Sequence, residues 1–138
     1  MAYIAYLDLL GTKDFCNEKG IYKTNIDKFY KAVDLCSHII GDKGRIGLFS
    51  DCMYIECFNL EWMLDFLTEL RRLLIADNLF FNAALAAGEL GPVTTHKKTP
   101  HIDAVKFSDE RITDIYCKQT LYRGIGIWLY DFPEALLL

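Results

Sequence analysis

The chain has 138 residues, of which 52% are hydrophobic, and its formal net charge at pH 7 is -4. This length and apolar content suit one globular domain with a core of its own, so residues 1–138 are read as a single unit. The acidic balance argues against a protein dedicated to nucleic-acid polymers, and no apolar run approaches the length of a membrane span.

The chain opens with a predicted strand and a predicted helix. The stretch "AYIAYLDLL" at 2–10 is rich in aliphatic and aromatic residues, which is typical of a buried strand. Residues 24–40 carry apolar side chains at helical spacing on one stripe. Thr24 or Asn25 is expected to cap this helix, and Gly41 stands where a helix usually ends.

A hairpin and the remaining elements follow. In "GRIGLFSDCMYIEC", at 44–57, two β-rich runs flank a Ser-Asp pair, which indicates two strands joined by a tight turn. Asn59 is a good cap for an amphipathic helix. The core face of that helix is expected to hold Trp62, Met63, Phe66, Leu67, Leu70, Leu73 and Leu74. Then come a strand at 80–90, a polar loop at 91–103, a helix at 108–121 and a strand at 124–130.

This order predicts an α+β fold with a ferredoxin-like βαββαβ core and an added helix and strand. In that topology the first two strands run parallel, and the third strand lies between them and antiparallel to both. The end of the first strand and the turn of the hairpin therefore lie at the same edge of the sheet. Asp8 is near the end of the first strand and Asp51 is in the turn, so the two carboxylates are expected to converge.

Two interpretations of this pair stay open. Asp51 taken alone is an ordinary turn residue. Two carboxylates at one spot repel each other unless something neutralises them, and a divalent cation such as Mg²⁺ does so with oxygen ligands. The glycine turn at Gly11 and the charge of Lys13 would suit a phosphate beside such an ion.

The same residues resemble a known family. "YLDLLGTKDF" and "RIGLFSDCMYIEC" resemble the two metal-binding motifs of the class III nucleotide cyclases. "FFNAALAAGELGPV" and "ERITDIYCKQTLYRGIGIWL" match the later strand and the helix-then-strand of that family. The opening motif and the Ser-Asp hairpin are closest to the small bacterial pyrimidine cyclases of Pycsar anti-phage defence, which make cyclic CMP or cyclic UMP.

The resemblance implies a homodimer with shared active sites that cyclises a nucleoside triphosphate. It implies that Asp8 and Asp51 are catalytic and that two Mg²⁺ or Mn²⁺ ions are bound by Asp8, Leu9 and Asp51. The substrate contacts implied in the same way are Leu10, Gly11, Thr12, Lys13 and Ser50. A positively charged side chain is also expected near the phosphates, and the candidates are Lys13, Lys97, Lys98 and Arg123.

Three departures from the family pattern bear on activity. Purine-selecting members have a base-reading lysine where residues 47–49 are Gly, Leu and Phe, which favours a pyrimidine substrate. Thr12 replaces the phenylalanine that closes the first motif. The helix positions that hold Asn and Arg in classical members fall here at Thr113 or Asp114 and at Cys117 or Lys118.

Two other hypotheses therefore remain beside the enzyme. One is a cyclase-fold domain that is catalytically inactive and serves as a nucleotide-binding or dimerisation module. The other is an unrelated ferredoxin-like regulatory domain that binds a small ligand.

For the remaining titratable residues the sequence predicts a location but no specific chemistry. Five cysteines without a CxxC spacing are expected to be reduced, buried thiols of a cytoplasmic protein. His96 and His101 are assigned to a loop, His38 to the surface, and Glu89 either to the site or to a solvated strand end.

Overall fold

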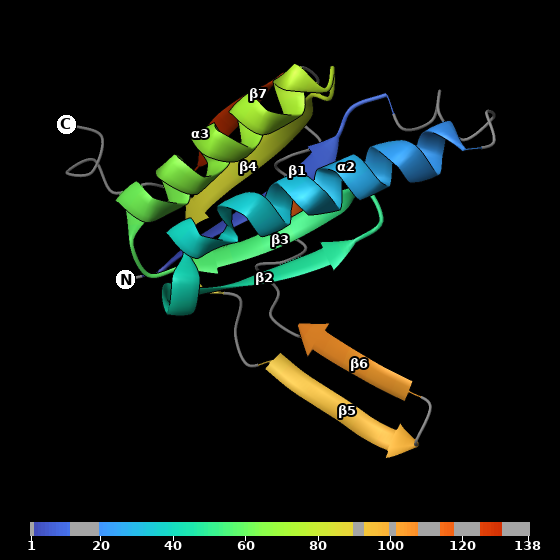
Figure 1. Ribbon diagram of the computed structural model, residues 1–138. Coiled ribbons are helices and arrows are strands. Elements are labelled where there is room, and N and C mark those ends of the chain that lie inside the picture. The colour runs from blue at the N-terminus through green and yellow to red at the C-terminus, as the bar shows by residue number, and fades with distance from the viewer. Residues whose placement is uncertain are drawn as a thin grey trace.

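The computed structural model describes residues 2–11, 20–89, 93–99, 102–107, 114–117 and 125–130, with the backbone alone for 93–99 and 102–107. The elements, labelled in Figure 1, are β1 Tyr3–Leu9, α2 Ile21–Cys36, β2 Gly44–Phe49, β3 Cys52–Cys57, α3 Leu60–Ala76, β4 Phe81–Ala87, β5 Val93–Thr99, β6 Ile102–Phe107 and β7 Gly126–Tyr130. Two short 3₁₀ turns, Ser37–Ile39 and Gly41–Lys43, connect α2 to β2.

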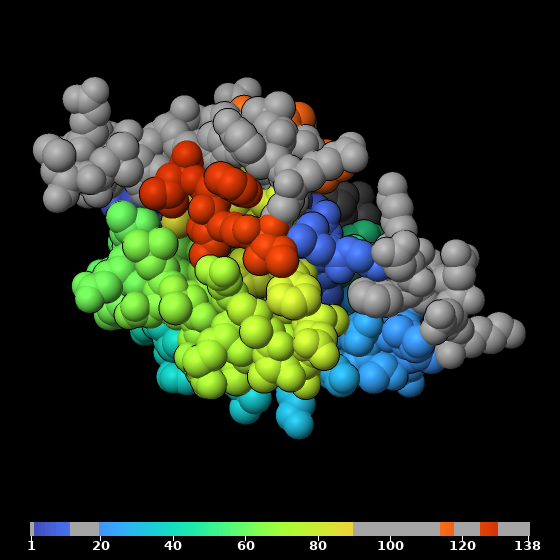
Figure 2. Space-filling model, turned by 90° about the horizontal axis from the view of Figure 1, so that it is seen from above, coloured from blue at the N-terminus to red at the C-terminus, as the bar shows by residue number. Residues whose placement is uncertain are grey.

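Five strands form one sheet in the order β2-β3-β1-β4-β7. β1 lies between β3 and β4 and is antiparallel to both, and β2 pairs antiparallel with β3. β7 pairs parallel with β4, and Figure 2 shows it at this edge of the molecule beside β4 and α3. The predicted α+β fold with a βαββαβ core and an added strand is confirmed.

The two helices α2 and α3 cover one face of the sheet (Figure 1), so the alternation of side chains along β1 divides the core in two. Tyr3, Ala5, Leu7 and Leu9 belong to the main core together with buried side chains of both helices. On the other face, a smaller cluster is formed by Ile4, Tyr6, Ala84, Ala86 and Ile115. Asp8 is two residues after Tyr6 in the strand, so its side chain lies on this second face.

The helix ends show what local signals can predict. Asn59 caps α3 as expected, since its side chain accepts a hydrogen bond of 2.9 Å from the N–H of Trp62. α2 starts at Ile21, three residues earlier than predicted, and Gly20 with φ 96° stands at its N-cap. Thr24 is inside the helix instead, where its hydroxyl donates to the Gly20 carbonyl at 2.7 Å.

Two details of the α-helices also differ from the predictions. The α-helical part of α2 ends at Cys36 and continues as a 3₁₀ turn, so Gly41 does not end it directly. Trp62 is 37% exposed and lies outside the core face of α3. The buried stripe of α3 consists of Met63, Phe66, Leu67, Leu70 and Leu74.

The expected polar loop at 91–103 is wrong. β5 and β6 form an antiparallel two-stranded sheet, which extends away from the main sheet in Figure 1. Pairing such as Val93 with Phe107 joins backbone groups across the hairpin, and this pairing offsets the low strand preference of the central His and Lys residues. Of the helix predicted at 108–121, the structure describes one helical turn at 114–117, and the rest lies outside the described residues.

Candidate functional site

Asp8 and Asp51 meet at the edge of the sheet, as the βαββαβ topology predicts. Asp8 pairs in register with Cys52, directly after Asp51, and the N–H of Leu9 donates to the Asp51 carbonyl at 2.9 Å. The two carboxyl groups are in hydrogen-bonding contact. Burial, and then the neighbouring Asp51 carboxylate, raise the pKa of Asp8 from 3.8 to about 6. Both causes disfavour two negative charges at this spot.

The residues at this spot fit a hard divalent cation. The donors are carboxylate oxygens, which Mg²⁺ and Mn²⁺ prefer, and a cation between them would relieve the repulsion. Within the part of the chain that the structure describes, no group of three or more His, Cys, Asp and Glu side chains is placed to hold a metal. An ion here would therefore complete its coordination with main-chain, water or substrate oxygens, which is usual for Mg²⁺ at phosphate sites.

An apolar and aromatic layer surrounds Asp8 on the same face of the sheet. Tyr6 stacks against Tyr54, with ring centroids 4.8 Å apart, and meets Tyr116 edge-on at 5.3 Å. The hydroxyl of Tyr6 is hydrogen-bonded to Cys52, and burial is the main cause that raises the pKa of Tyr6. Burial likewise raises the pKa of Cys52. Both groups are therefore neutral at pH 7, and the charge of this region lies on the two aspartates.

The turn that carries Asp51 is held by two side chains of α2. Ser50 has φ 55°, in the left-handed region. Its hydroxyl is hydrogen-bonded to that of Tyr22. Its main chain makes a hydrogen bond with the hydroxyl of Tyr30, whose pKa is nevertheless raised, chiefly by burial. Ser50, a predicted substrate contact, thus faces two tyrosines of α2.

The turn after β1 has the geometry expected of a glycine turn. Gly11 has φ 77°, which favours glycine. The N–H of Leu10 donates to the Phe80 carbonyl at 2.9 Å, so this predicted substrate contact has its N–H occupied within the chain. Thr12 and Lys13 lie outside the described residues.

Several solved structures with a similar fold are nucleotide cyclases. The guanylyl cyclase Cya2 has a TM-score of 0.71 at 14% identity, over 93% of this chain and 73% of that one. The guanylate cyclase domain of RhGC from Catenaria anguillulae, in complex with GTP, has a TM-score of 0.69 at 9% identity, over 93% and 76%. A bacterial light-regulated adenylyl cyclase has 0.62 at 11% identity, over 87% and 69%. The chain has the class III nucleotide cyclase fold. By sequence, no family model and no curated protein matches it.

Other candidates lie elsewhere in this cyclase fold or outside its described part. Glu89 follows the end of β4 that lies beside Tyr3, far from Asp8, because β4 runs antiparallel to β1. His38 is exposed on the helical side, where it lines a shallow cavity of about 350 Å³ with Asp65 and Glu69. The side chains of His96, Lys97, Lys98, His101, Lys118 and Arg123 lie outside the described residues.

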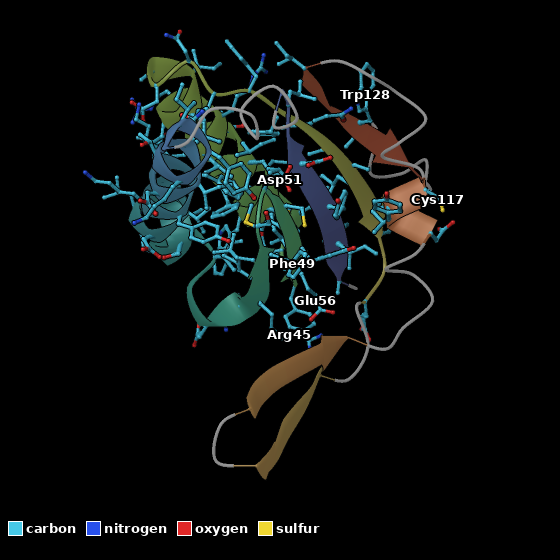
Figure 3. The ribbon with its side chains drawn as sticks, turned by 90° about the vertical axis from the view of Figure 1, so that its right-hand side faces the viewer. Arg45, Phe49, Asp51, Glu56, Cys117 and Trp128 are labelled. Carbon is cyan, nitrogen blue, oxygen red and sulfur yellow. The ribbon has the colours of Figure 1, made fainter. Side chains whose placement is uncertain are left out.

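An ion pair occupies the far end of the β2–β3 hairpin of the cyclase fold. Arg45 and Glu56 pair in register, and an Arg45 guanidinium nitrogen lies 2.6 Å from a carboxylate oxygen of Glu56, which is only 2% exposed. Figure 3 shows this pair and Asp51 at opposite ends of the hairpin. Sequence analysis missed it, although a two-residue turn at Ser50 and Asp51 places the two residues directly opposite each other.

The remaining predictions concern thiols and membranes. Of the cysteines that the structure describes, Cys36 and Cys57 are buried as expected, whereas Cys52 is half-buried and Cys117 is exposed, so the prediction of buried thiols is wrong for these two. No disulfide joins these four residues. No helix in the described ranges is long and apolar enough to cross a membrane.

Proposed function

We propose that this chain is a metal-dependent nucleotide cyclase that converts CTP or UTP to its 3′,5′-cyclic monophosphate and pyrophosphate. The observation that carries this proposal is the contact between Asp8 and Asp51 at the sheet edge of a class III cyclase fold. A structural role alone does not require two carboxylates to share a partly buried position, because each disfavours the charged form of the other.

In this reaction the ribose 3′-oxygen forms a bond to the α-phosphorus. The bond between the α-phosphorus and the oxygen that bridges it to the β-phosphorus breaks, so pyrophosphate leaves, and the hydroxyl proton is released. Asp8, Asp51 and the main chain of Leu9 would hold two Mg²⁺ or Mn²⁺ ions. Such ions lower the pKa of the attacking hydroxyl and neutralise the charge of the leaving pyrophosphate. The chain itself supplies the negative charge that binds the cations and the rigid strand and turn that fix their position.

The preference for a pyrimidine is supported by β2. Gly47 pairs in register with Tyr54, at the position where the resemblance places a base-reading lysine in purine-selecting members. A pocket that hydrogen-bonds its base rejects a mismatched base strongly, because buried polar groups are then left unpaired. We therefore propose CTP or UTP as the substrate, and a signal in anti-phage defence as the role of the product.

A homodimer with shared active sites belongs to the same proposal. A guanylyl cyclase domain from Blastocladiella emersonii with a similar fold has been crystallised as a monomer and as a non-canonical dimer. In this chain, Phe49 is 75% exposed two residues before Asp51, and Leu48 beside it is also exposed. We propose that the partner packs against this exposed aromatic side chain beside the candidate site.

The test is to incubate the protein with each of the four nucleoside triphosphates and Mn²⁺ and to identify the products by mass. We expect cyclic CMP or cyclic UMP from the parent. Asp51→Asn should lower turnover by at least about 100-fold, since even loss of a group that orients a metal ligand costs about 10- to 100-fold. Asp27→Asn, which changes an exposed aspartate of α2, is the control and should keep the parent's turnover.

The pattern of results separates the hypotheses. Cyclic AMP or cyclic GMP as the main product would remove the pyrimidine preference and leave the cyclase. Nucleotide binding without any product would favour the inactive module. Full turnover in Asp51→Asn would return Asp51 to the role of an ordinary turn residue.

A further inference from the structure

The turn that carries Asp51 has a backbone conformation that serine disfavours. Ser50 has a positive φ, and Asp51 does not. In a two-residue hairpin with positive φ at the first central residue, glycine dominates that position. A residue with a side chain keeps such a conformation only where its surroundings fix it. The surroundings of Ser50 therefore need to supply specific contacts.

Two tyrosines of α2 supply those contacts. Tyr22 and Tyr30 are eight residues apart, slightly more than two helical turns, so they lie on the same side of α2. The hydroxyl of Tyr22 holds the Ser50 side chain, and that of Tyr30 holds the Ser50 main chain. Both tyrosines are half-buried, which favours these hydrogen bonds over bonds to water.

The contacts matter for the residue that follows. The Asp51 carbonyl is tied to β1 by the Leu9 N–H, but its carboxylate meets Asp8, which it repels when both are charged. Without a fixed turn, this repulsion would move the hairpin tip away from β1. We infer that Tyr22 and Tyr30 are positioning residues that hold the Ser50–Asp51 turn so that the Asp51 carboxylate stays beside Asp8 and both carboxylates can bind divalent cations.

The claim that the two aspartates bind a cation rests on the proposed function. The claim that the tyrosines fix the turn does not. The test therefore combines hydrogen exchange of the turn amides in the metal-free protein with titration by Mn²⁺ without nucleotide. In Tyr22→Phe/Tyr30→Phe, which keeps the apolar bulk, we expect the Ser50 amide to exchange about 5- to 10-fold faster. Mn²⁺ affinity should fall about 10-fold, as is typical when a group that orients a metal ligand is lost.

The matched control is Tyr3→Phe. Tyr3 lies at the other end of β1, opposite Cys57, in the core below the helices. The substitution Tyr3→Phe removes one tyrosine hydroxyl from the same sheet, far from the turn. The exchange rate of the turn amides and the Mn²⁺ affinity should therefore match the parent's.

A second pair of variants isolates the backbone. Ser50→Ala and Ser50→Gly both lose the hydroxyl that meets Tyr22, but only glycine adopts a positive φ without steric cost. We expect Ser50→Gly to exchange its turn amides more slowly and to bind Mn²⁺ more tightly than Ser50→Ala, by about 5-fold or more. Equal behaviour of the two variants would show that the turn needs no support.

Each result has one meaning. Unchanged exchange in the double tyrosine variant would overturn the hold on the turn. Faster exchange with unchanged Mn²⁺ affinity would overturn the positioning role. A parent that binds no Mn²⁺ and makes no cyclic nucleotide would overturn the proposed function and the positioning role together, while the exchange rates would still decide whether the tyrosines hold the turn.

Discussion

Asp8 lies in surroundings that disfavour its charge. Asp51, Tyr6 and Cys52 face it, and none of them carries a positive charge. The tyrosine and the thiol have raised pKa values and stay neutral, and burial and the neighbouring Asp51 raise the pKa of Asp8 to about 6. In the absence of a cation, the folded chain therefore binds a proton at Asp8 more tightly than the unfolded chain does.

The first prediction is a pH dependence of stability without metal. Because folding raises the pKa of Asp8 from 3.8 to about 6, its stabilising contribution is complete below about pH 3.8 and is lost as the pH rises through 6. Asp8→Asn should thus raise the thermal midpoint at pH 7.5 but not at pH 4. We expect Asp8→Asn to stabilise the fold by roughly 1 kcal/mol at pH 7.5, a value discounted for the partial solvent screening of this group. This gain would raise the thermal midpoint by about 3 °C.

Thermal unfolding of the parent and Asp8→Asn in a chelating buffer, at several pH values, measures this effect. Asp27→Asn serves as the control, and its midpoint should follow the parent's at every pH. Parallel curves for the parent and Asp8→Asn between pH 4 and 7.5 would contradict the prediction.

At the scale of elements, the cap of α3 offers a sharp test. The Asn59 side chain accepts from the Trp62 N–H, one of the N–H groups that a helix leaves without a partner at its start. Asn59→Ala should lower the free energy of unfolding by about 1 kcal/mol. Asn59→Asp keeps the acceptor and should stay near the parent in denaturant titration. A loss of equal size in both variants would show that the cap is not the cause.

Long periodic segments were the part of the fold that sequence predicted best. The apolar stripe of α3 and its cap were predicted because they depend on neighbours within a few residues. The start of α2 was not, since Gly20 at its N-cap has no side chain to signal it. The β5–β6 hairpin was missed for a different reason. Its two strands are adjacent in the chain, but His96 and the lysines beside it have a low strand preference and indicate a loop.

The candidate site divides in the same way. The convergence of Asp8 and Asp51 follows from the strand order alone, so the sequence was sufficient. The contact between Tyr22 and Ser50 joins residues 28 positions apart and depends on how α2 lies on the hairpin tip. No periodicity indicates such a contact, and only a folded structure shows it.

At the scale of the whole molecule, we predict a dimer that forms through the hairpin tip. Sedimentation with Mn²⁺ and CTP should show a dimer, and activity per chain should fall on dilution. Phe49→Ser should weaken the dimer, because it removes an exposed apolar side chain beside Asp51. Phe58→Ser changes a residue that is 57% exposed at the other end of β3 and is the matched control. A strictly monomeric chain with full activity would exclude shared sites.

The central place of β1 has a consequence for synthesis on the ribosome. β1 is made first, but its partners are β3 and β4, whose last residues are Cys57 and Ala87. At roughly 5–20 residues per second, the strand waits for about 4–16 s before both neighbours exist. During that time its apolar side chains and open edges are exposed, which is where nascent chains aggregate or bind chaperones. A chain cut short before β4 would leave one edge of β1 open beside the two aspartates.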